Sequence, residues 1–147
     1  MWKSLSFVGA LVPAIVFAFA GIVKLLDPFS LASFLSYALW LSFPRALTLA
    51  GWIAGFEVVL AACLCLFFGR SRIPAYAGLC LLAFFCGLLV EVLWRWPDMA
   101  TCGCFGSLSV RSNPPTPRVQ LAMDLGLMAL LGAHLLSFRR SSLEHAE

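Results

Sequence analysis

The stretch ALTLAGWIAGFEVVLAACLCLFF, residues 46–68, decides the fold because its side chains are apolar or small apart from one carboxylate, that of Glu57. A run of this length exceeds the roughly 20 residues that an α-helix needs to cross the hydrocarbon core of a bilayer. Backbone polar groups in lipid must be satisfied within the segment, so a helix is the conformation that such a run adopts. The stretch therefore predicts a membrane-spanning helix with a charged residue near its middle.

Three more apolar runs, about residues 7–26, 74–94 and 119–138, have the same character. The whole chain of 147 residues is 62% hydrophobic and only 12% charged, far from the composition of soluble domains. We therefore expect residues 1–147 to form a single membrane domain, an all-α integral membrane protein built as a four-transmembrane-helix bundle. The first run could instead be a secretory signal, since Ala18-Phe19-Ala20 resembles a cleavage site, but its apolar pattern continues to Leu26.

A fifth element, about residues 28–43, is expected between the first two spans. Asp27 is suited to cap a helix and Pro28 to begin one, while Pro44 is expected to end it. This serine-interrupted segment is short for a crossing, so it predicts an amphipathic helix that lies on the membrane surface or packs over the mouth of the bundle. A tight fifth span is the alternative. The short connection at residues 69–73 predicts that the second and third spans are antiparallel neighbours.

The long polar loop, residues 97–117, carries the motif Thr101-Cys102-Gly103-Cys104-Phe105-Gly106-Ser107. Two thiols one residue apart can be reduced, bonded to each other, or shared with a partner as a mixed disulfide. A disulfide over this spacing would be strained and easily reduced. A static structural disulfide or a metal clip is the alternative interpretation.

The orientation of the chain is predicted from its basic residues. Four spans place both termini on one side of the membrane, and the plain count of Lys and Arg is equal on the two sides. The arginines crowd the helix ends on the terminal side (Arg70, Arg72, Arg139 and Arg140). We therefore expect cytoplasmic termini and a periplasmic Cys-Gly-Cys loop. A net charge of +3 without a polybasic run indicates membrane orientation and no nucleic-acid partner.

Three charged residues fall inside the spans on the side of the loop: Lys24, Glu57 and Asp124. An unpaired charge in the bilayer is costly, so we expect these groups to face the bundle, with Lys24 paired to Glu57 or Asp124. They are either a structural polar tie or a site that handles protons or seats a membrane quinone. Glu91 precedes Arg95 by four residues, the favourable order for an interfacial ion pair.

Four further cysteines lie within the spans (Cys63, Cys65, Cys80 and Cys86). Cys63 and Cys80 are expected at similar depth and could form a second redox pair, although buried cysteines more often act as small apolar side chains. His134 is interpreted as hydrogen-bonded or interfacial and not as a ligand.

Three features together resemble a known family: Ala20 to Pro28 with its Gly21-x-x-Lys24 element, Glu57 in the second span, and Cys102-Gly103-Cys104-Phe105-Gly106 after the third. They are similar to the methylamine utilisation protein MauE family, which is related to the DoxX-like membrane proteins. The resemblance covers nearly the whole chain and implies a four-helix membrane protein. It also implies a role in maturing a disulfide-rich client, as in methylamine dehydrogenase biogenesis, beside a periplasmic thioredoxin-like partner. Lys24, Glu57, Cys102 and Cys104 match its pattern, whereas the four cysteines within the spans do not.

From the loop and the resemblance together we predict a bacterial inner-membrane thiol-disulfide redox protein in which Cys102 and Cys104 exchange disulfides with periplasmic proteins. Lys24, Glu57 and Asp124 would serve as a proton or quinone site, a membrane quinone being the one cofactor considered. Two other classes stay open: a non-catalytic scaffold or small-solute carrier whose Cys-Gly-Cys is a staple, and a Cu(I)-handling protein, because paired thiolates suit that ion.

Overall fold

A computed structural model describes the backbone of residues 2–67, 71–96 and 116–144 and the side chains of residues 9–67, 71–96 and 116–137. The described residues form five helices and no strand: α1 (Trp2–Leu26), α2 (Pro28–Ala38), α3 (Phe43–Leu66), α4 (Ile73–Arg95) and α5 (Pro117–Glu144). Four of them, all except α2, are long and apolar enough to cross a membrane. The predicted fold class, a four-span bundle with a short helix between the first two spans, is confirmed.

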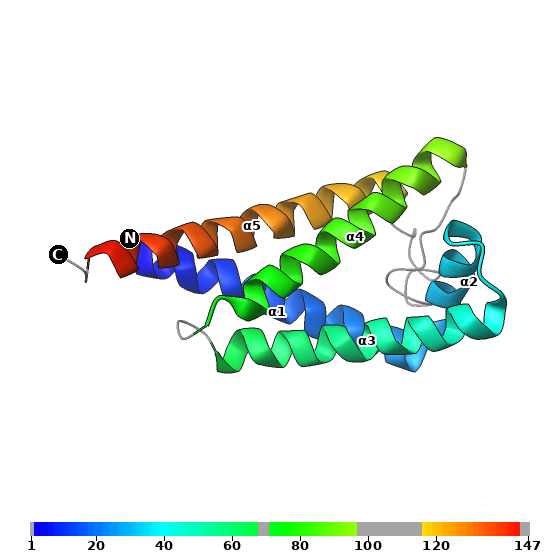
Figure 1. Ribbon diagram of the computed structural model, residues 1–147, viewed down its shortest axis with the longest axis horizontal. Helices are drawn as coiled ribbons and strands as arrows, with labels where there is room; N and C mark the ends of the chain where they lie inside the picture. Colours follow the sequence, from blue (N-terminus) through cyan, green and yellow to red (C-terminus); the bar gives the residue numbers. More distant parts are fainter. Residues whose placement is uncertain (1, 68–70, 97–115, 145–147) are drawn as a thin grey trace.

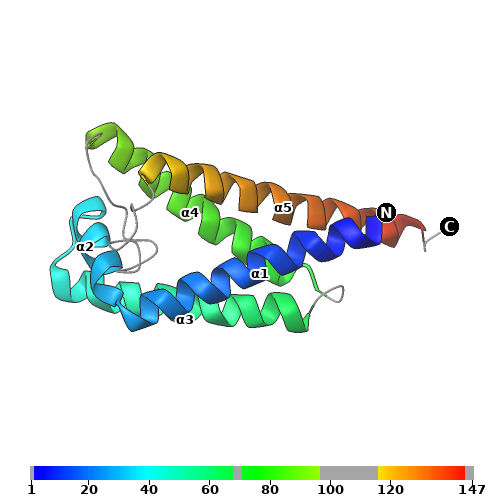
Figure 2. The same ribbon diagram turned by 180° about the vertical axis from the view of Figure 1, so that it is seen from behind.

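The four long helices run along the long axis of the molecule, and α2 lies across one end (Figure 1). Both termini lie at the opposite end, which is also where α3 gives way to α4 (Figure 2). The α2 end also holds the last residues of α1 and α4 and the first residues of α3 and α5. The chain is therefore a multi-pass membrane protein with its termini on one side and α2 on the other.

Helix α1 is the centre of the packing, since it lies along both α3 and α5. Two glycines allow this close approach. A Cβ at Gly21 would lie 2.8 Å from Val58 Cγ2 and 2.9 Å from the Ala54 carbonyl oxygen on α3, and one at Gly9 would lie 2.9 Å from the Leu130 carbonyl oxygen on α5. In lipid, where apolar side chains gain little by leaving the solvent, such close backbone contact is a main source of helix association.

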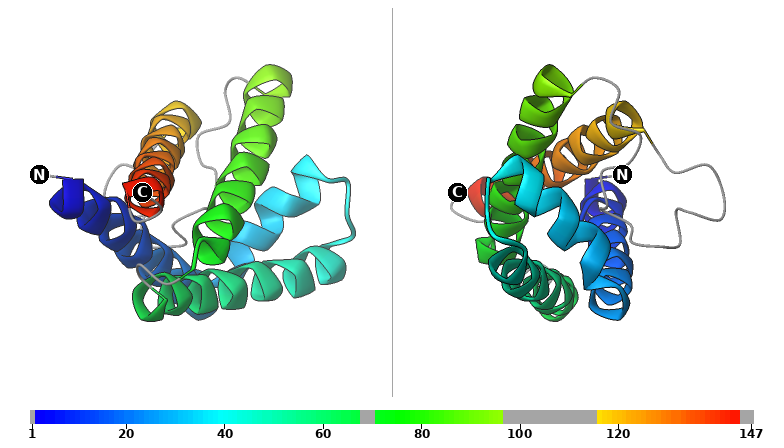
Figure 3. Two further views of the ribbon diagram at one scale, coloured as in Figure 1. Left: turned by 60° about the vertical axis from the view of Figure 1, so that its left-hand side comes forward. Right: turned by 90° about the vertical axis from the view of Figure 1, so that its right-hand side faces the viewer.

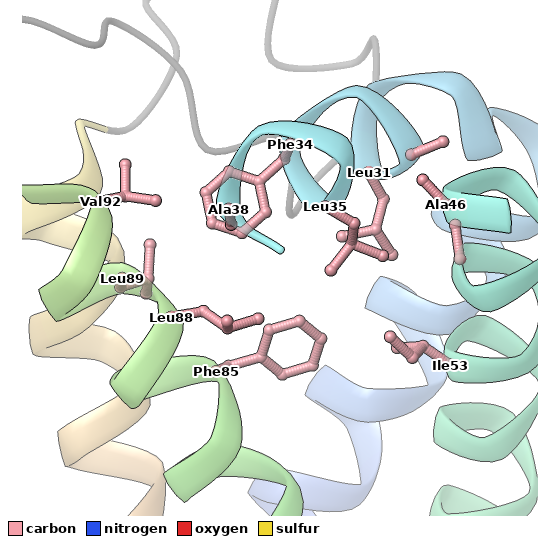
Figure 4. Close-up of a cluster of buried hydrophobic side chains, with 12 residues drawn as sticks. Leu31, Phe34, Leu35, Ala38, Ala46, Ile53, Phe85, Leu88, Leu89 and Val92 are labelled. Carbon is pink, nitrogen blue, oxygen red and sulfur yellow. The ribbon is translucent and has the colours of Figure 1, made fainter. Parts of the chain in front are cut away.

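Helix α2 packs between α3 and α4. Its residues Leu31, Phe34 and Leu35 are buried against side chains such as Ile53 of α3 and Phe85 of α4 (Figure 4). Seen along the bundle axis, α2 crosses the end of the bundle (Figure 3, right). Of the alternatives for this segment, packing over the bundle mouth is therefore the one observed.

The predicted pairing of α3 with α4 is only partly confirmed, because the two helices have few contacts with each other. The two helices are antiparallel, but α4 packs mainly along α5.

Three residues at helix boundaries do not have the places predicted for them. Helix α2 ends at Ala38, before Trp40 takes a left-handed backbone conformation with φ of 53°. Pro44 does not end α2 but stands in the first turn of α3, where its missing N–H has no cost. Likewise Pro117, assigned from the sequence to the loop, is the first residue of α5. Asp27 occupies the N-cap position of α2, but its carboxylate makes no capping hydrogen bond to the helix backbone and accepts one from the Ser30 hydroxyl at 3.1 Å.

The α2 end also carries exposed aromatic rings, notably those of Tyr37, Trp40 and Trp94. Such amphipathic rings settle at the membrane–water boundary. Beside them the carboxylate of Glu91 lies 2.9 Å from the guanidinium of Arg95, which confirms the predicted interfacial ion pair. This end of the bundle therefore marks one face of the membrane.

Candidate functional site

The ammonium group of Lys24 and the carboxylate of Glu57 form an ion pair inside the bundle. Lys24 Nζ donates a hydrogen bond to Glu57 Oε1 at 2.5 Å, and the two residues are only 3% and 2% exposed. The same ammonium lies 4.8 Å from the centre of the Phe85 ring on α4, within the range of a cation–π interaction. The sequence predicted either Glu57 or Asp124 as the partner of Lys24, and the structure shows the ion pair with Glu57.

The pairing follows from the close crossing of α1 and α3. Gly21 lies three residues before Lys24, so the two are on the same side of α1. A Cβ at Gly21 would lie 3.1 Å from Glu57 Cβ, which is tighter than ordinary contact. Glycine at this position therefore brings the backbone of α1 near enough to α3 for Lys24 to reach the carboxylate. The Gly21-x-x-Lys24 element is thus a structural unit.

Asp124 belongs to the same polar group but has a different hydrogen-bond partner. The side-chain amide of Gln120, one turn earlier on α5, donates to Asp124 Oδ1 at 2.9 Å, and both residues are 5% exposed. Sequence reasoning missed Gln120. The available signal was its position four residues before Asp124 on an apolar helix, which places the two side chains on one face.

A cavity of about 30 Å³ lies among these side chains and is otherwise lined by apolar residues from α1, α4 and α5. The polar residues on its wall are Lys24, Glu57, Gln120 and Asp124, and the apolar ones include Leu82 and Phe85 of α4. A space of this size exceeds the volume of about 10–15 Å³ that a water molecule requires. The structure thus brings all three predicted buried charges to one cavity.

Two buried oxygen atoms on this cavity have no hydrogen-bond partner among the described residues: Glu57 Oε2 and Gln120 Oε1. Buried acceptors are almost always satisfied in folded proteins by a protein group or by ordered water. Leaving one unpaired costs about 1–3 kcal/mol. The two oxygens therefore indicate that the cavity takes a hydrogen-bond donor.

The two motif cysteines, Cys102 and Cys104, lie outside the described residues. The segment that contains them joins Trp96, after α4, to Thr116, before α5, at the same end of the bundle as α2. Gln120 is the fourth residue after Thr116. Gln120, on the wall of the polar cavity, therefore lies in the first turn of α5, the helix that follows the motif segment in the sequence.

The four cysteines within the spans are all free thiols. Cys65 and Cys80 are exposed on the outer surface of the bundle, so they face the lipid, while Cys63 and Cys86 are partly buried. Cys86 Sγ lies 4.0 Å from Met128 Sδ on α5. The second redox pair of Cys63 and Cys80, suggested by their similar depth, stays a prediction. His134 is buried on α5, and its carbonyl oxygen accepts a hydrogen bond from Ser137 at 2.7 Å.

The fold and the buried cluster define a class: small multi-pass helical membrane proteins whose first and second spans are joined by an internal lysine–glutamate ion pair. The family model described as methylamine utilisation protein MauE matches residues 2–137, so the chain belongs to that family. Membership links this membrane protein to methylamine utilisation. Neither a curated protein nor a solved structure matches the chain.

Proposed function

We propose that this protein is a thiol-disulfide exchange protein of the bacterial inner membrane, acting through Cys102 and Cys104 in the maturation of disulfide-rich periplasmic redox proteins. The observation that carries the proposal is the place at which the motif segment is attached. It joins α4 to α5 at the end of the bundle that bears α2 and the exposed Trp40 and Trp94. A pair of thiols tethered at one membrane face is accessible to water-soluble partners on that side alone.

Disulfide exchange needs only the client dithiol and the motif disulfide as reactants. A thiolate of the client attacks the Cys102–Cys104 disulfide, one motif cysteine leaves as a thiolate, and a mixed disulfide forms with the other. The second thiolate of the client then attacks the mixed disulfide and releases the motif cysteine. Two electrons and two protons pass from the client dithiol to the motif pair, and the client gains one disulfide. The reverse sequence reduces a client disulfide.

Family membership supports the class of client. The link to methylamine utilisation is consistent with a disulfide-rich client such as the small subunit of methylamine dehydrogenase, with a periplasmic thioredoxin-like protein as the exchange partner. We place the termini in the cytoplasm and the motif segment in the periplasm, because that compartment permits disulfides to persist.

A membrane quinone is the electron acceptor that we propose for restoring the disulfide after each cycle. We propose that Lys24, Glu57 and Asp124, which line the internal cavity, supply the protons that the quinone takes up on reduction or orient its headgroup.

The proposal is tested by trapping the mixed disulfide. Cys104→Ser or Cys102→Ser should yield a covalent adduct with a periplasmic thioredoxin-like partner, released by reductant, because the remaining sulfur can no longer be displaced from within. Only one of the two variants should trap strongly, since one motif cysteine is the atom that bonds the partner. The double Cys102→Ser/Cys104→Ser variant is the matched control and should trap nothing.

The other two functions give different results in the same experiment. A structural staple would leave both single variants less stable and without any adduct, whereas a Cu(I) site would lose metal binding equally in both. If neither single variant traps a partner and the double variant still supports client maturation in cells, thiol exchange is not the function.

A further inference from the structure

Thiol exchange at the motif does not account for the polar cavity between α1, α3, α4 and α5. We propose that it binds water and that Asp124 holds a proton there, which the bound water can pass to Glu57. The cavity would then be a buried proton-binding site whose polar residues come from three different spans.

The unsatisfied acceptors on the cavity wall indicate that the ligand is a hydrogen-bond donor such as water. Glu57 Oε2 and Gln120 Oε1 are buried acceptors that receive no hydrogen bond from any residue the structure describes, and each residue is at least nine-tenths buried and lines the cavity. One water molecule supplies two donors and can accept from Lys24, whose ammonium has three N–H groups. Water can therefore donate to these oxygens, in a space of about 30 Å³ that admits one or two such molecules.

The charged residues on the cavity wall indicate that the site binds one proton. Within the described part of the chain, the cavity wall carries one cation, Lys24 on α1, and two carboxylates, Glu57 on α3 and Asp124 on α5. Helix α4 contributes the apolar Leu82 and Phe85 to the wall, and its Cys86 thiol faces Met128, one turn beyond Asp124. With both carboxylates ionised the group would carry a net negative charge in a medium that penalises it strongly. One bound proton makes the group neutral.

The contacts decide which carboxylate holds that proton. Glu57 is in direct contact with the Lys24 ammonium, which stabilises its ionised form. Asp124 receives its hydrogen bond from the uncharged amide of Gln120. The proton therefore resides on Asp124. When it leaves Asp124 for the water oxygen, the water gives one of its own protons to Glu57 Oε2, so that one proton is shared across the cavity.

The test is infrared spectroscopy of the purified full-length protein in lipid at neutral pH. The C=O stretch of a protonated carboxylic acid is separate from that of a carboxylate and shifts in D₂O. We expect the unsubstituted protein to show one such group per chain. Asp124→Asn and Glu57→Gln should each abolish it, because in either variant Lys24 and the one remaining carboxylate are already neutral together. Both substitutions conserve shape, and circular dichroism confirms that each variant is folded.

Glu91→Gln is the matched control, since it removes a carboxylate of the exposed Glu91–Arg95 pair and should leave the band unchanged. Absence of the band from the unsubstituted protein would overturn the proposal. A band that persists in Glu57→Gln but not in Asp124→Asn would show that no charge is shared, and the reverse pattern would place the proton on Glu57; either result refutes the proposed site. Transfer to D₂O tests the water: a prompt downshift is expected, whereas an unshifted band would mean a dry cavity.

Discussion

Replacing only one residue of the Lys24–Glu57 pair should destabilise the protein far more than replacing both together. Each partner is almost fully buried and contacts the other directly. Stranding one member of a buried ion pair costs about 3–5 kcal/mol, whereas replacing both members with apolar residues of similar volume is often neutral or stabilising. We therefore expect Lys24→Met and Glu57→Met each to lower the free energy of unfolding by about 3–5 kcal/mol. The double variant should cost much less than their sum.

The surroundings of the pair predict an asymmetry between the two single variants. Without Glu57, the ammonium of Lys24 still has Asp124 on the same cavity wall as a second carboxylate. Without Lys24, two carboxylates remain and the described wall offers no other cation. Glu57→Met should therefore be the milder single change.

The assay is reversible unfolding in mixed micelles, followed by tryptophan fluorescence and circular dichroism, as a double-mutant cycle. Glu91→Gln is the control, since its partly exposed pair with Arg95 should contribute only about 0–1 kcal/mol. Single variants no less stable than Glu91→Gln would refute the buried-pair interpretation. A double variant that costs the full sum of the singles would also refute it.

The remaining predictions concern the helix crossing and the cysteines within the spans. Gly21→Ala should destabilise the protein by about 1–3 kcal/mol, because the new methyl group meets Val58 and the Ala54 backbone, while Gly55→Ala, whose Cβ would meet nothing within 4 Å, should be neutral or slightly stabilising. Equal unfolding free energies for the two variants would show that α1 and α3 do not approach as closely as described. Replacing all four cysteines of the spans with alanine should leave the trapped adduct of the motif pair intact on a non-reducing gel, and its loss would mean that a thiol within the spans takes part in exchange.

Much of the fold was predictable from the sequence because hydropathy and length alone identify segments that cross a bilayer. All four predicted spans correspond to helices in the structure. The end of α2 was not predictable, because Trp40 adopts a left-handed conformation that glycine or asparagine usually signals. The wedging of α2 between α3 and α4 depends on how the helices tilt, which no local pattern encodes.

The candidate site was predictable in part for a similar reason. Charges in a span must face inward, so Lys24, Glu57 and Asp124 could be expected to lie together. The sequence alone could not decide between Glu57 and Asp124 as the partner of Lys24, because the choice depends on the close crossing at Gly21. Gln120 was missed because an uncharged amide near a helix end carries a weak signal. Cys102 and Cys104 lie outside the described residues, so their roles stay predictions.

Labelling of the motif cysteines from one side of the membrane tests the central proposal most directly. In a variant whose cysteines are Cys102 and Cys104 only, a membrane-impermeant thiol reagent should label intact spheroplasts weakly before reduction and at two sites after mild reduction. That result would place a reducible pair on the periplasmic face, as disulfide exchange requires. Labelling confined to inverted vesicles, or equal labelling with and without reductant, would contradict the proposal.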